Sequence, residues 1–179
     1  MKQKILFFLD LFTLHFGLAN YLQNNLDCEI FALIDTTNKP KKFFQEQKIV
    51  NFKKTWFYHD EINLKNSFDV EYISKLDKKY DLDFQQLIKN DRFFSDFNKF
   101  HKFSHNEIES ILTQEVKLYE EIIDQCKPDF LIMFQPSLRH EYVFYEICKQ
   151  NNIIPMIINA GYIGYTSFIS KNINLLDNL

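Results

Sequence analysis

Residues 4–17 read KILFFLDLFTLHFG, and this stretch decides the expected fold. Its first part, Lys4–Leu9, is apolar at consecutive positions, which is typical of a strand buried on both faces in a parallel sheet. The polar Asp10 ends the strand, and Thr13 can cap a helix that runs to about Asn25. A buried strand followed at once by a helix is the first unit of an α/β fold.

The same alternation continues along the chain. Four apolar side chains recur at helical spacing in the first helix and are expected to face the sheet: Leu14, Leu18, Tyr21 and Leu22. Further strands are expected at 28–35, 48–52, 128–134 and 152–159, with an extended segment at 54–62. Further helices are expected at 40–47, 70–79, 84–88, 91–104, 104–126 and 137–151. The order predicts a single α/β domain over residues 1–179, with a Rossmann-like open parallel sheet and helices on both faces.

The composition excludes several classes of protein. The chain has 179 residues, of which 46% are hydrophobic, and this suits one domain with a proper core. The net charge of -3 and the pI of about 6.0 do not fit a nucleic-acid binder. Cys28, Cys126 and Cys148 are too few and too far apart for a disulfide framework or a metal motif, so we expect reduced thiols and a reducing compartment.

No membrane anchor is expected. Residues 5–22 are largely apolar, but Asp10 and His15 interrupt them, and a charge near the centre of a membrane span is costly. The same interruption breaks the apolar region that a signal peptide needs. We therefore expect no transmembrane segment.

The sequence also lacks several familiar motifs. After the first strand there is no G-x-G-x-x-G, and the chain has no P-loop and no G-x-S-x-G nucleophile elbow. Its five histidines show no metal-ligand spacing. No cofactor and no metal are predicted.

Three stretches resemble a known family. They are KILFFLDLFTLHFGLANYLQ (4–23), KPDFLIMF (127–134) and EYVFYEICKQNNIIPMIINAGYIG (141–164). They are similar to the N-terminal half of capsular polysaccharide biosynthesis proteins, which resemble GT-B glycosyltransferases. The shared features are a His and a Gly after the first strand and a short turn with Asn159 and Gly161 after the last.

The resemblance implies a glycosyltransferase of surface polysaccharide assembly, with this chain as its acceptor-side half. Its partners would be a nucleotide-sugar and a glycan acceptor, and its location cytoplasmic or peripheral at the inner membrane face. GT-B enzymes need a second domain, which usually binds the nucleotide-sugar. Activity from this chain without a second domain or partner chain is therefore not expected.

The candidate site lies where strands end, because ligands of open parallel sheets bind at the carboxyl ends of strands. Asp10 ends the first strand and is followed by His15, which can act as a base toward an acceptor hydroxyl. Gly17, inside the helix, indicates close packing or ligand approach. The alternatives are a capping carboxylate for Asp10 and a merely packed or exposed His15.

Other residues at strand ends are candidates for substrate binding. Asp35, Thr36 and Thr37 can hydrogen-bond sugar hydroxyls, or simply form a polar turn. Beyond the last strand, Asn159 and Gly161 begin a binding or hinge loop, or only a tight turn.

A second cluster follows the strand at 128–134. It contains Gln135, Ser137, Arg139 and His140. Ser137 at a helix start can hold a phosphate or carboxylate, and Arg139 can pair with it bidentately; the alternative is a capped helix with a surface arginine. Trp56 and His59 are possible sugar contacts, or core and loop residues.

A different class of function stays open. In residues 91–104 the phenylalanines form one helical stripe: Phe93, Phe94, Phe97, Phe100 and Phe103. The stripe can belong to the core, or it can bind a lipid or an apolar partner. In that second case the chain is a non-catalytic α/β binding or interaction module that needs a partner chain.

Overall fold

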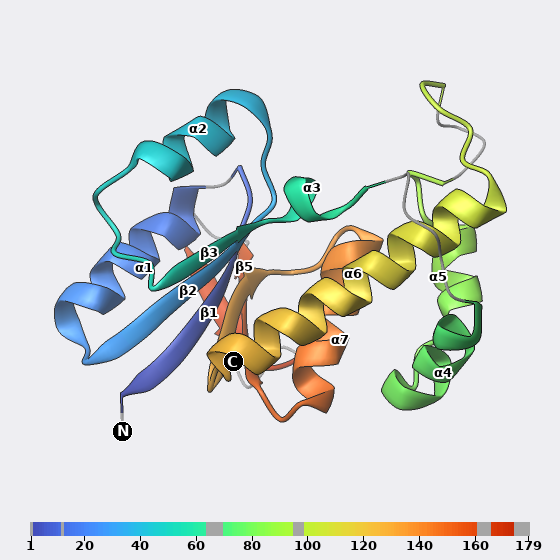
Figure 1. The fold of residues 1–179 in the computed structure, drawn as a ribbon. Helices are drawn as coiled ribbons and strands as arrows, with labels where there is room; N and C mark the ends of the chain where they lie inside the picture. The colour runs from blue at the N-terminus through green and yellow to red at the C-terminus, as the bar shows by residue number, and fades with distance from the viewer. Residues whose placement is uncertain (1, 12, 64–69, 95–98, 161–165, 174–179) are drawn as a thin grey trace.

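The computed structural model describes residues 2–11, 13–63, 70–94, 99–160 and 166–173. In these residues the chain forms an α/β fold, with six strands in one sheet and seven helices (Figure 1). The strands are β1 (Gln3–Leu9), β2 (Cys28–Ile34), β3 (Lys54–Phe57), β4 (Phe130–Phe134), β5 (Ile154–Ala160) and β6 (Ser167–Ser170). The helices are α1 (Thr13–Asn25), α2 (Asn38–Glu46), α3 (Tyr58–Glu61), α4 (Val70–Tyr80), α5 (Phe84–Asn90), α6 (His105–Cys126) and α7 (Arg139–Gln150).

The sheet has the strand order β3-β2-β1-β4-β5-β6. Strands β1 to β5 are parallel to their neighbours, whereas β6 is antiparallel to β5. The expected wholly parallel sheet is therefore wrong in one respect: the sheet is mixed, because the chain turns back after β5. From β1 the chain adds β2 and then β3 on one side, and it later adds β4, β5 and β6 on the other side. The order of the strands therefore reverses between β1 and β4.

Side chains of β1 alternate between two apolar clusters. Phe7 and Leu9 pack with residues of α1 and α2 on one face, while Leu6 and Phe8 pack with α6 and α7 on the other. Consecutive residues of a strand point to opposite faces, so the continuous apolar run in the sequence feeds both clusters. The helices cover both faces of the sheet, as expected (Figure 1).

The buried face of α1 differs from the expected one. Leu14 and Tyr21 are exposed, while Phe16 and Ala19 are buried against the sheet. Gly17 lies on the exposed side of this helix, and a Cβ added there would meet no atom within 4 Å. The interpretation that Gly17 allows another part of the protein to pack closely against α1 is therefore wrong.

Helix α6 forms as predicted. Its N-cap Ser104 accepts the backbone N–H of Glu107, and the Glu107 carboxylate accepts the N–H of Ser104 at 2.7 Å, which completes the expected capping box. The helix ends at Lys127, in the left-handed conformation directly before Pro128.

The middle of the chain departs most from the sequence prediction. The described parts of 91–104 contain no helix, and residues 48–52 form no strand. The edge strand is β3 instead, followed at once by the short helix α3, and neither α3 nor β6 was expected. Among the helices that the structure describes, none combines the length and the apolar character needed to cross a membrane.

Candidate functional site

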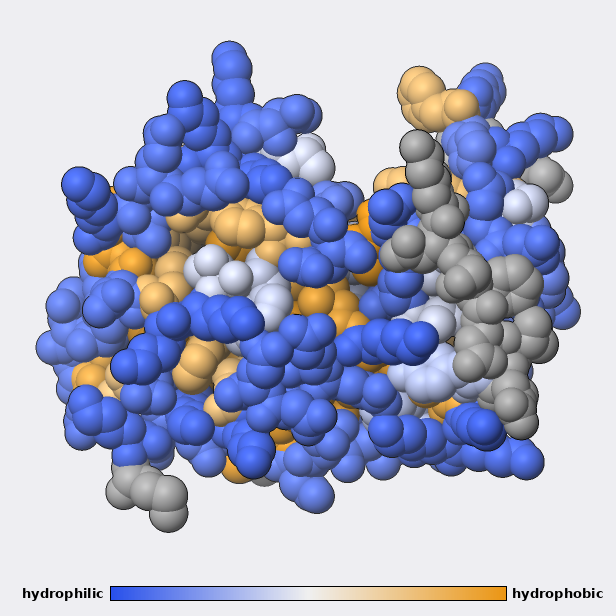
Figure 2. All heavy atoms as spheres, in the orientation of Figure 1, coloured by the Kyte–Doolittle hydropathy of each residue, from blue (hydrophilic) through white to orange (hydrophobic). Residues whose placement is uncertain are grey.

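A pocket of about 600 Å³ opens at the carboxyl edge of the sheet. Residues that follow β1, β2, β3 and β4 line one side of it, and residues from the segment after α5 and from α6 line the other. In Figure 2 the surface is hollowed between the part that carries α2 and α3 and the part that carries α5, with apolar side chains at the base of the hollow. Pockets of this volume hold small organic molecules.

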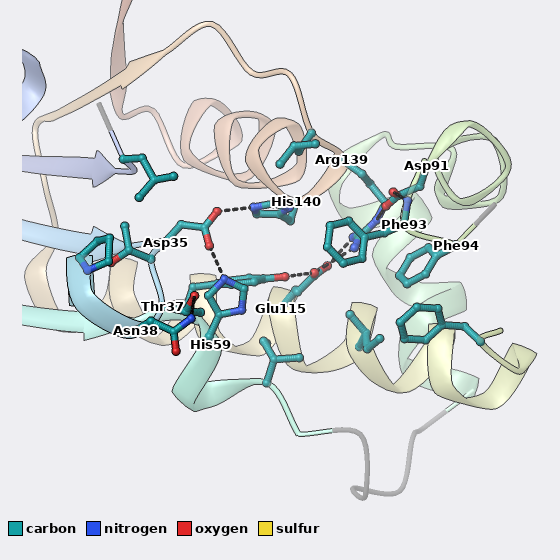
Figure 3. Close-up of a pocket in the computed structure, with 18 residues that line it drawn as sticks. Asp35, Thr37, Asn38, His59, Asp91, Phe93, Phe94, Glu115, Arg139 and His140 are labelled. Atoms are coloured by element: carbon teal, nitrogen blue, oxygen red, sulfur yellow. Dashed lines mark hydrogen bonds and ion pairs between the residues drawn. The ribbon is translucent and has the colours of Figure 1, made fainter. Parts of the chain in front are cut away.

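Asp35, the residue after β2, is held between two imidazole rings (Figure 3). Its Oδ1 lies 2.8 Å from Nε2 of His59, and its Oδ2 lies 2.9 Å from Nε2 of His140. Three elements meet in this cluster, because His59 lies in α3 and His140 in the first turn of α7.

The ionisation of Asp35 fixes the protons of both rings. Burial raises the pKa of Asp35, but the hydrogen bonds and charges of His140 and His59 outweigh burial and hold the pKa well below its usual value. An ionised carboxylate only accepts hydrogen bonds, so each histidine must carry a proton on Nε2. In a neutral ring the remaining nitrogen, Nδ1, is then a proton acceptor.

His140 and His59 occupy different environments. The ring of His140 is buried and stacks on Tyr58, with centroids 4.8 Å apart, while the side chain of His59 is 45% exposed. Burial lowers the pKa of His140, but the hydrogen bond to Asp35 and the charge of Glu115 outweigh it and raise the pKa. A ligand in the pocket can therefore reach the ring of His59, whereas the buried ring of His140 binds the second carboxylate oxygen of Asp35.

A buried ionic network supports this cluster from below. The Glu115 side chain is fully buried; it accepts hydrogen bonds from the hydroxyl of Tyr58 and from both terminal nitrogens of Arg139, with Nη2 at 2.9 Å. Nε of Arg139 donates to Asp91 at 2.5 Å. Burial lowers the pKa of Arg139, but the charge of Glu115 outweighs burial and raises it, so Arg139 stays a cation.

Aromatic side chains line the opposite side of the pocket, beside the paired carboxylates of Asp91 and Glu115. The guanidinium of Arg139 lies 4.8 Å from the centre of the Phe94 ring, and Phe94 meets Phe103 edge to face at 5.3 Å. The apolar side chains that line the pocket are Leu11, Pro40, Ile62, Phe93, Phe94, Phe103, Ile111 and Leu138. The site therefore combines a polar cluster at the sheet edge with an apolar body.

One polar atom at the pocket is left without a partner. Thr36 lines the pocket and is 3% exposed, and its hydroxyl oxygen makes no hydrogen bond with any residue that the structure describes. Buried hydroxyls are nearly always paired in folded proteins. A ligand group that reaches Thr36 would supply the missing partner.

Asp35, His140 and Glu141 place potential metal-ligand atoms within 4.8 Å of one another. Each of these residues already has a protein partner. Asp35 and His140 bind each other, and a Glu141 oxygen accepts the backbone N–H groups of Ser137 and Leu138 at 2.7 and 2.9 Å. The Asp35–His140 pair and Glu141 thus make two separate sets of hydrogen bonds, and both sets anchor the start of α7.

Several residues singled out in the sequence meet at this pocket. Thr37 joins four others that line it: Asp35, Thr36, Arg139 and His140. His59, considered as a sugar contact, is part of the central cluster, whereas Trp56 is buried in the core. Arg139 differs from its expected environment, because its partners are the protein's own carboxylates.

The two predicted catalytic residues lie elsewhere. His15 is fully buried in α1, its ring centroid is 3.8 Å from that of Phe134, and neither ring nitrogen has a partner among the described residues. Burial lowers its pKa to about 4. Asp10 is half-buried, and neither residue lines the pocket. A catalytic role for either stays a prediction.

The remaining candidates also lie outside the pocket lining. Gln135 and Ser137 are exposed, and Ser137 interacts with Glu141 rather than with the pocket. The amide of Asn159 bonds to Ser170, joining β5 to β6. Gly161 lies outside the described residues.

Three residues of the site were not predicted from the sequence: Tyr58, Asp91 and Glu115. Tyr58 lies in a segment that was expected to be extended, and Asp91 was placed at the start of a helix. Glu115 recurs with the apolar side of α6 at helical spacing, and that position is the one signal that could have found it. A carboxylate on the buried face of a helix needs a partner, which here is Arg139.

Comparison with known proteins gives little resemblance. No protein-family model matches the chain, and no curated protein matches it. Among solved structures the chain is similar to a CDPS (cyclodipeptide synthase) from Fluoribacter dumoffii. The two are 15% identical with a TM-score of 0.47, and the match covers 87% of this chain and 88% of the other.

These comparisons correct the expected function. The similar structure is a CDPS and not a glycosyltransferase, and no matching family or curated protein connects the chain to capsule biosynthesis. The resemblance to capsular polysaccharide proteins is therefore wrong, and so is the predicted role as the acceptor-side half of a GT-B enzyme. The three stretches that suggested it contain strand, helix and turn patterns that any α/β protein shares.

Proposed function

We propose that this chain is a small-molecule enzyme of Rossmann-like architecture in which His59 acts as a general base. The single observation that carries the proposal is Asp35, held between His59 and His140 at the edge of the pocket. A carboxylate that accepts one ring N–H fixes the tautomer and directs the other nitrogen toward a substrate.

The position of the pocket supports a Rossmann-like arrangement. In doubly wound sheets, ligands bind outside the carboxyl ends of the strands, where the strand order reverses. Here the reversal lies between β1 and β4, and Leu11 after β1 and Leu138 after β4 both line the pocket. The glycine-rich phosphate loop of dinucleotide-binding proteins does not follow β1 in the sequence.

The chemistry follows from the cluster. With Nε2 of His59 donating to Asp35, its Nδ1 can take a proton from a hydroxyl or amine of a bound molecule. The proton leaves the bound group and joins the ring, and the positive charge that forms on the imidazole is stabilised by Asp35 at 2.8 Å. The group that has lost its proton becomes the nucleophile for a transfer reaction.

The covalent alternative has less support at this pocket. Among the described residues that line it there is no serine and no cysteine. Tyr58 donates its hydroxyl to Glu115, and burial and that carboxylate raise its pKa well above the usual value. A substrate nucleophile activated by His59 therefore fits the residues better than an enzyme nucleophile does.

The test is nitrogen NMR of the chain labelled with ¹⁵N-histidine. We expect His59 to carry its proton on Nε2, and we expect its Nδ1 signal to shift when 2-phenylethanol, an apolar body with a hydroxyl head, is titrated in. His59→Gln should abolish the site, whereas His105→Gln, an exposed histidine paired with Glu109 at 3.0 Å, should leave probe binding unchanged. A neutral His59 protonated on Nδ1, or no shift in a folded chain, would refute the proposal.

A further inference from the structure

We infer that the substrate of this pocket carries its reacting group as a primary amine on an apolar, ring-sized body. The inference rests on the proposed function, because it names the group from which His59 takes its proton. Three observations support it: the net negative charge of the pocket lining, the pairing of Arg139 with the protein's own carboxylates, and the acceptor sites of Asp35 that the two histidines leave unused.

The pocket has an excess of negative charge. Its lining holds three carboxylates, from Asp35, Asp91 and Glu115, against the guanidinium of Arg139. Two negative charges are uncompensated when both imidazoles are neutral, and one remains when His140 is protonated. A cationic head group is attracted to such a site, and an anionic one is repelled.

The one guanidinium in the described lining is not available to a ligand. The side chain of Arg139 is 5% exposed, and its Nε and both terminal nitrogens donate to Asp91 and Glu115. No lysine belongs to the described lining. A phosphate or carboxylate therefore finds no uncommitted cation there, which argues against nucleotides and other anionic substrates.

Asp35 can still accept hydrogen bonds from a ligand. A carboxylate offers about four lone-pair sites, and the two histidines use one on each oxygen. An ammonium group has three donors, so it can bind Asp35 and the unpartnered hydroxyl of Thr36 while a third hydrogen faces His59. A ligand hydroxyl has only one donor, so it cannot donate to Asp35 and to Nδ1 of His59 at the same time.

The proton transfer then balances. One N–H bond of the ammonium breaks, and a new N–H bond forms at Nδ1 of His59. The positive charge moves from the ligand to the imidazole beside Asp35, and the ligand is left as a neutral amine with a free electron pair. Phe93, Phe94 and Phe103 line the other side, where an aromatic or branched apolar body can pack.

The experiment compares three probes with the same aromatic body: 2-phenylethylamine, 2-phenylethanol and 3-phenylpropionate. Their dissociation constants for the full chain at pH 7 are measured by NMR titration at low and high salt. We expect the amine to bind about tenfold tighter than the alcohol, the value of one charge-assisted hydrogen bond, and the carboxylate to bind weakest. Salt should reduce the advantage of the amine.

Variants locate the effect. Asp35→Asn should remove the preference for the amine, whereas Asp27→Asn, an exposed carboxylate paired with Lys2 at 2.8 Å, should keep it. Equal affinity for alcohol and amine, or tightest binding of the carboxylate, would overturn this inference. If the alcohol alone still shifts His59, the proposed function stands; if no probe shifts it in the folded chain, both fail. The salt series on the unmodified chain decides the matter even if Asp35→Asn does not fold.

Discussion

Two buried histidines on opposite faces of the same sheet behave in opposite ways. His15 packs as an apolar ring against Phe134, and burial lowers its pKa to about 4. His140 is also buried, but its hydrogen bond to Asp35 and nearby carboxylates raise its pKa. Burial favours the neutral ring in both cases, and only the partners of His140 reverse the outcome. The partners of His140, Asp35 and Glu115, also line the pocket.

The largest effect is expected when Arg139, the cation of the network around His140, is removed. Arg139→Met leaves the buried carboxylates of Glu115 and Asp91 without their counter-ion. We expect a loss of about 3–5 kcal/mol in the free energy of unfolding, measured by urea denaturation. Lys48→Met, which removes an exposed cation elsewhere, should change it by less than about 0.5 kcal/mol. A similarly small loss for Arg139→Met would mean that the network does not hold this face.

The free energy of unfolding should decrease in acid because of His15. The folded pKa of His15, about 4, lies below the ordinary value of 6.5, so folding favours the neutral ring. The full stability is present above pH 6.5 and is lost progressively as the pH falls toward 4, by about 3 kcal/mol from this residue. Between pH 7 and 4, His15→Leu should therefore lose about that much less unfolding free energy than the unmodified chain.

Denaturation at pH 7, 5 and 4 measures this difference. His105→Leu, at an exposed histidine, serves as the matched control and should follow the unmodified chain. If the curves for His15→Leu and the unmodified chain run parallel with pH, His15 is not a neutral, partnerless ring in the folded protein.

His140 should show the opposite pH dependence. His140→Phe keeps a ring on Tyr58 but removes the donor to Asp35, which we expect to cost about 1–3 kcal/mol of unfolding free energy near neutral pH. Because the folded pKa of His140 is raised, its contribution is fully present below pH 6.5 and is lost as the pH rises through the folded pKa. Denaturation at pH 6, 7, 8 and 9 should show the variant's deficit shrinking as the pH rises; a growing deficit would contradict the assignment.

The smallest expected effect concerns the helix that carries His15. Gly17 lies on the exposed side of α1, and a Cβ there meets nothing within 4 Å. Gly17→Ala should raise the free energy of unfolding by about 0.5–1 kcal/mol through helix propensity. Thermal denaturation checks this, and a destabilised variant would show that the space beside Gly17 is needed for something else.

The alternation of strands and helices could be predicted because it rests on local patterns. The apolar runs at β1 and β4 and the capping box of α6 are each visible within a few neighbouring residues. The antiparallel β6 could not be predicted, because its pairing with β5 depends on the direction in which the chain returns.

Only part of the site could be predicted from the sequence, for a related reason. Asp35, Arg139 and His140 stand at strand ends, where a general rule about α/β folds directs attention. No such rule identifies Glu115 and Asp91, because these carboxylates pair with Arg139 across 24 and 48 positions of the sequence. His15 attracted attention by its place near a helix start, whereas packing against Phe134 decides its environment.

The central position of β1 also has a consequence for synthesis of the chain. β1 pairs with β2 soon after both have been made, but its other neighbour, β4, begins at Phe130. Arg139 comes later still, so a nascent chain that ends before it carries Glu115 and Asp91 without their cation. The pocket can therefore form only after Arg139 and His140 have been synthesised. Until β4 is made, one edge of β1 has no partner strand, and unpaired strand edges make partly folded chains prone to aggregation.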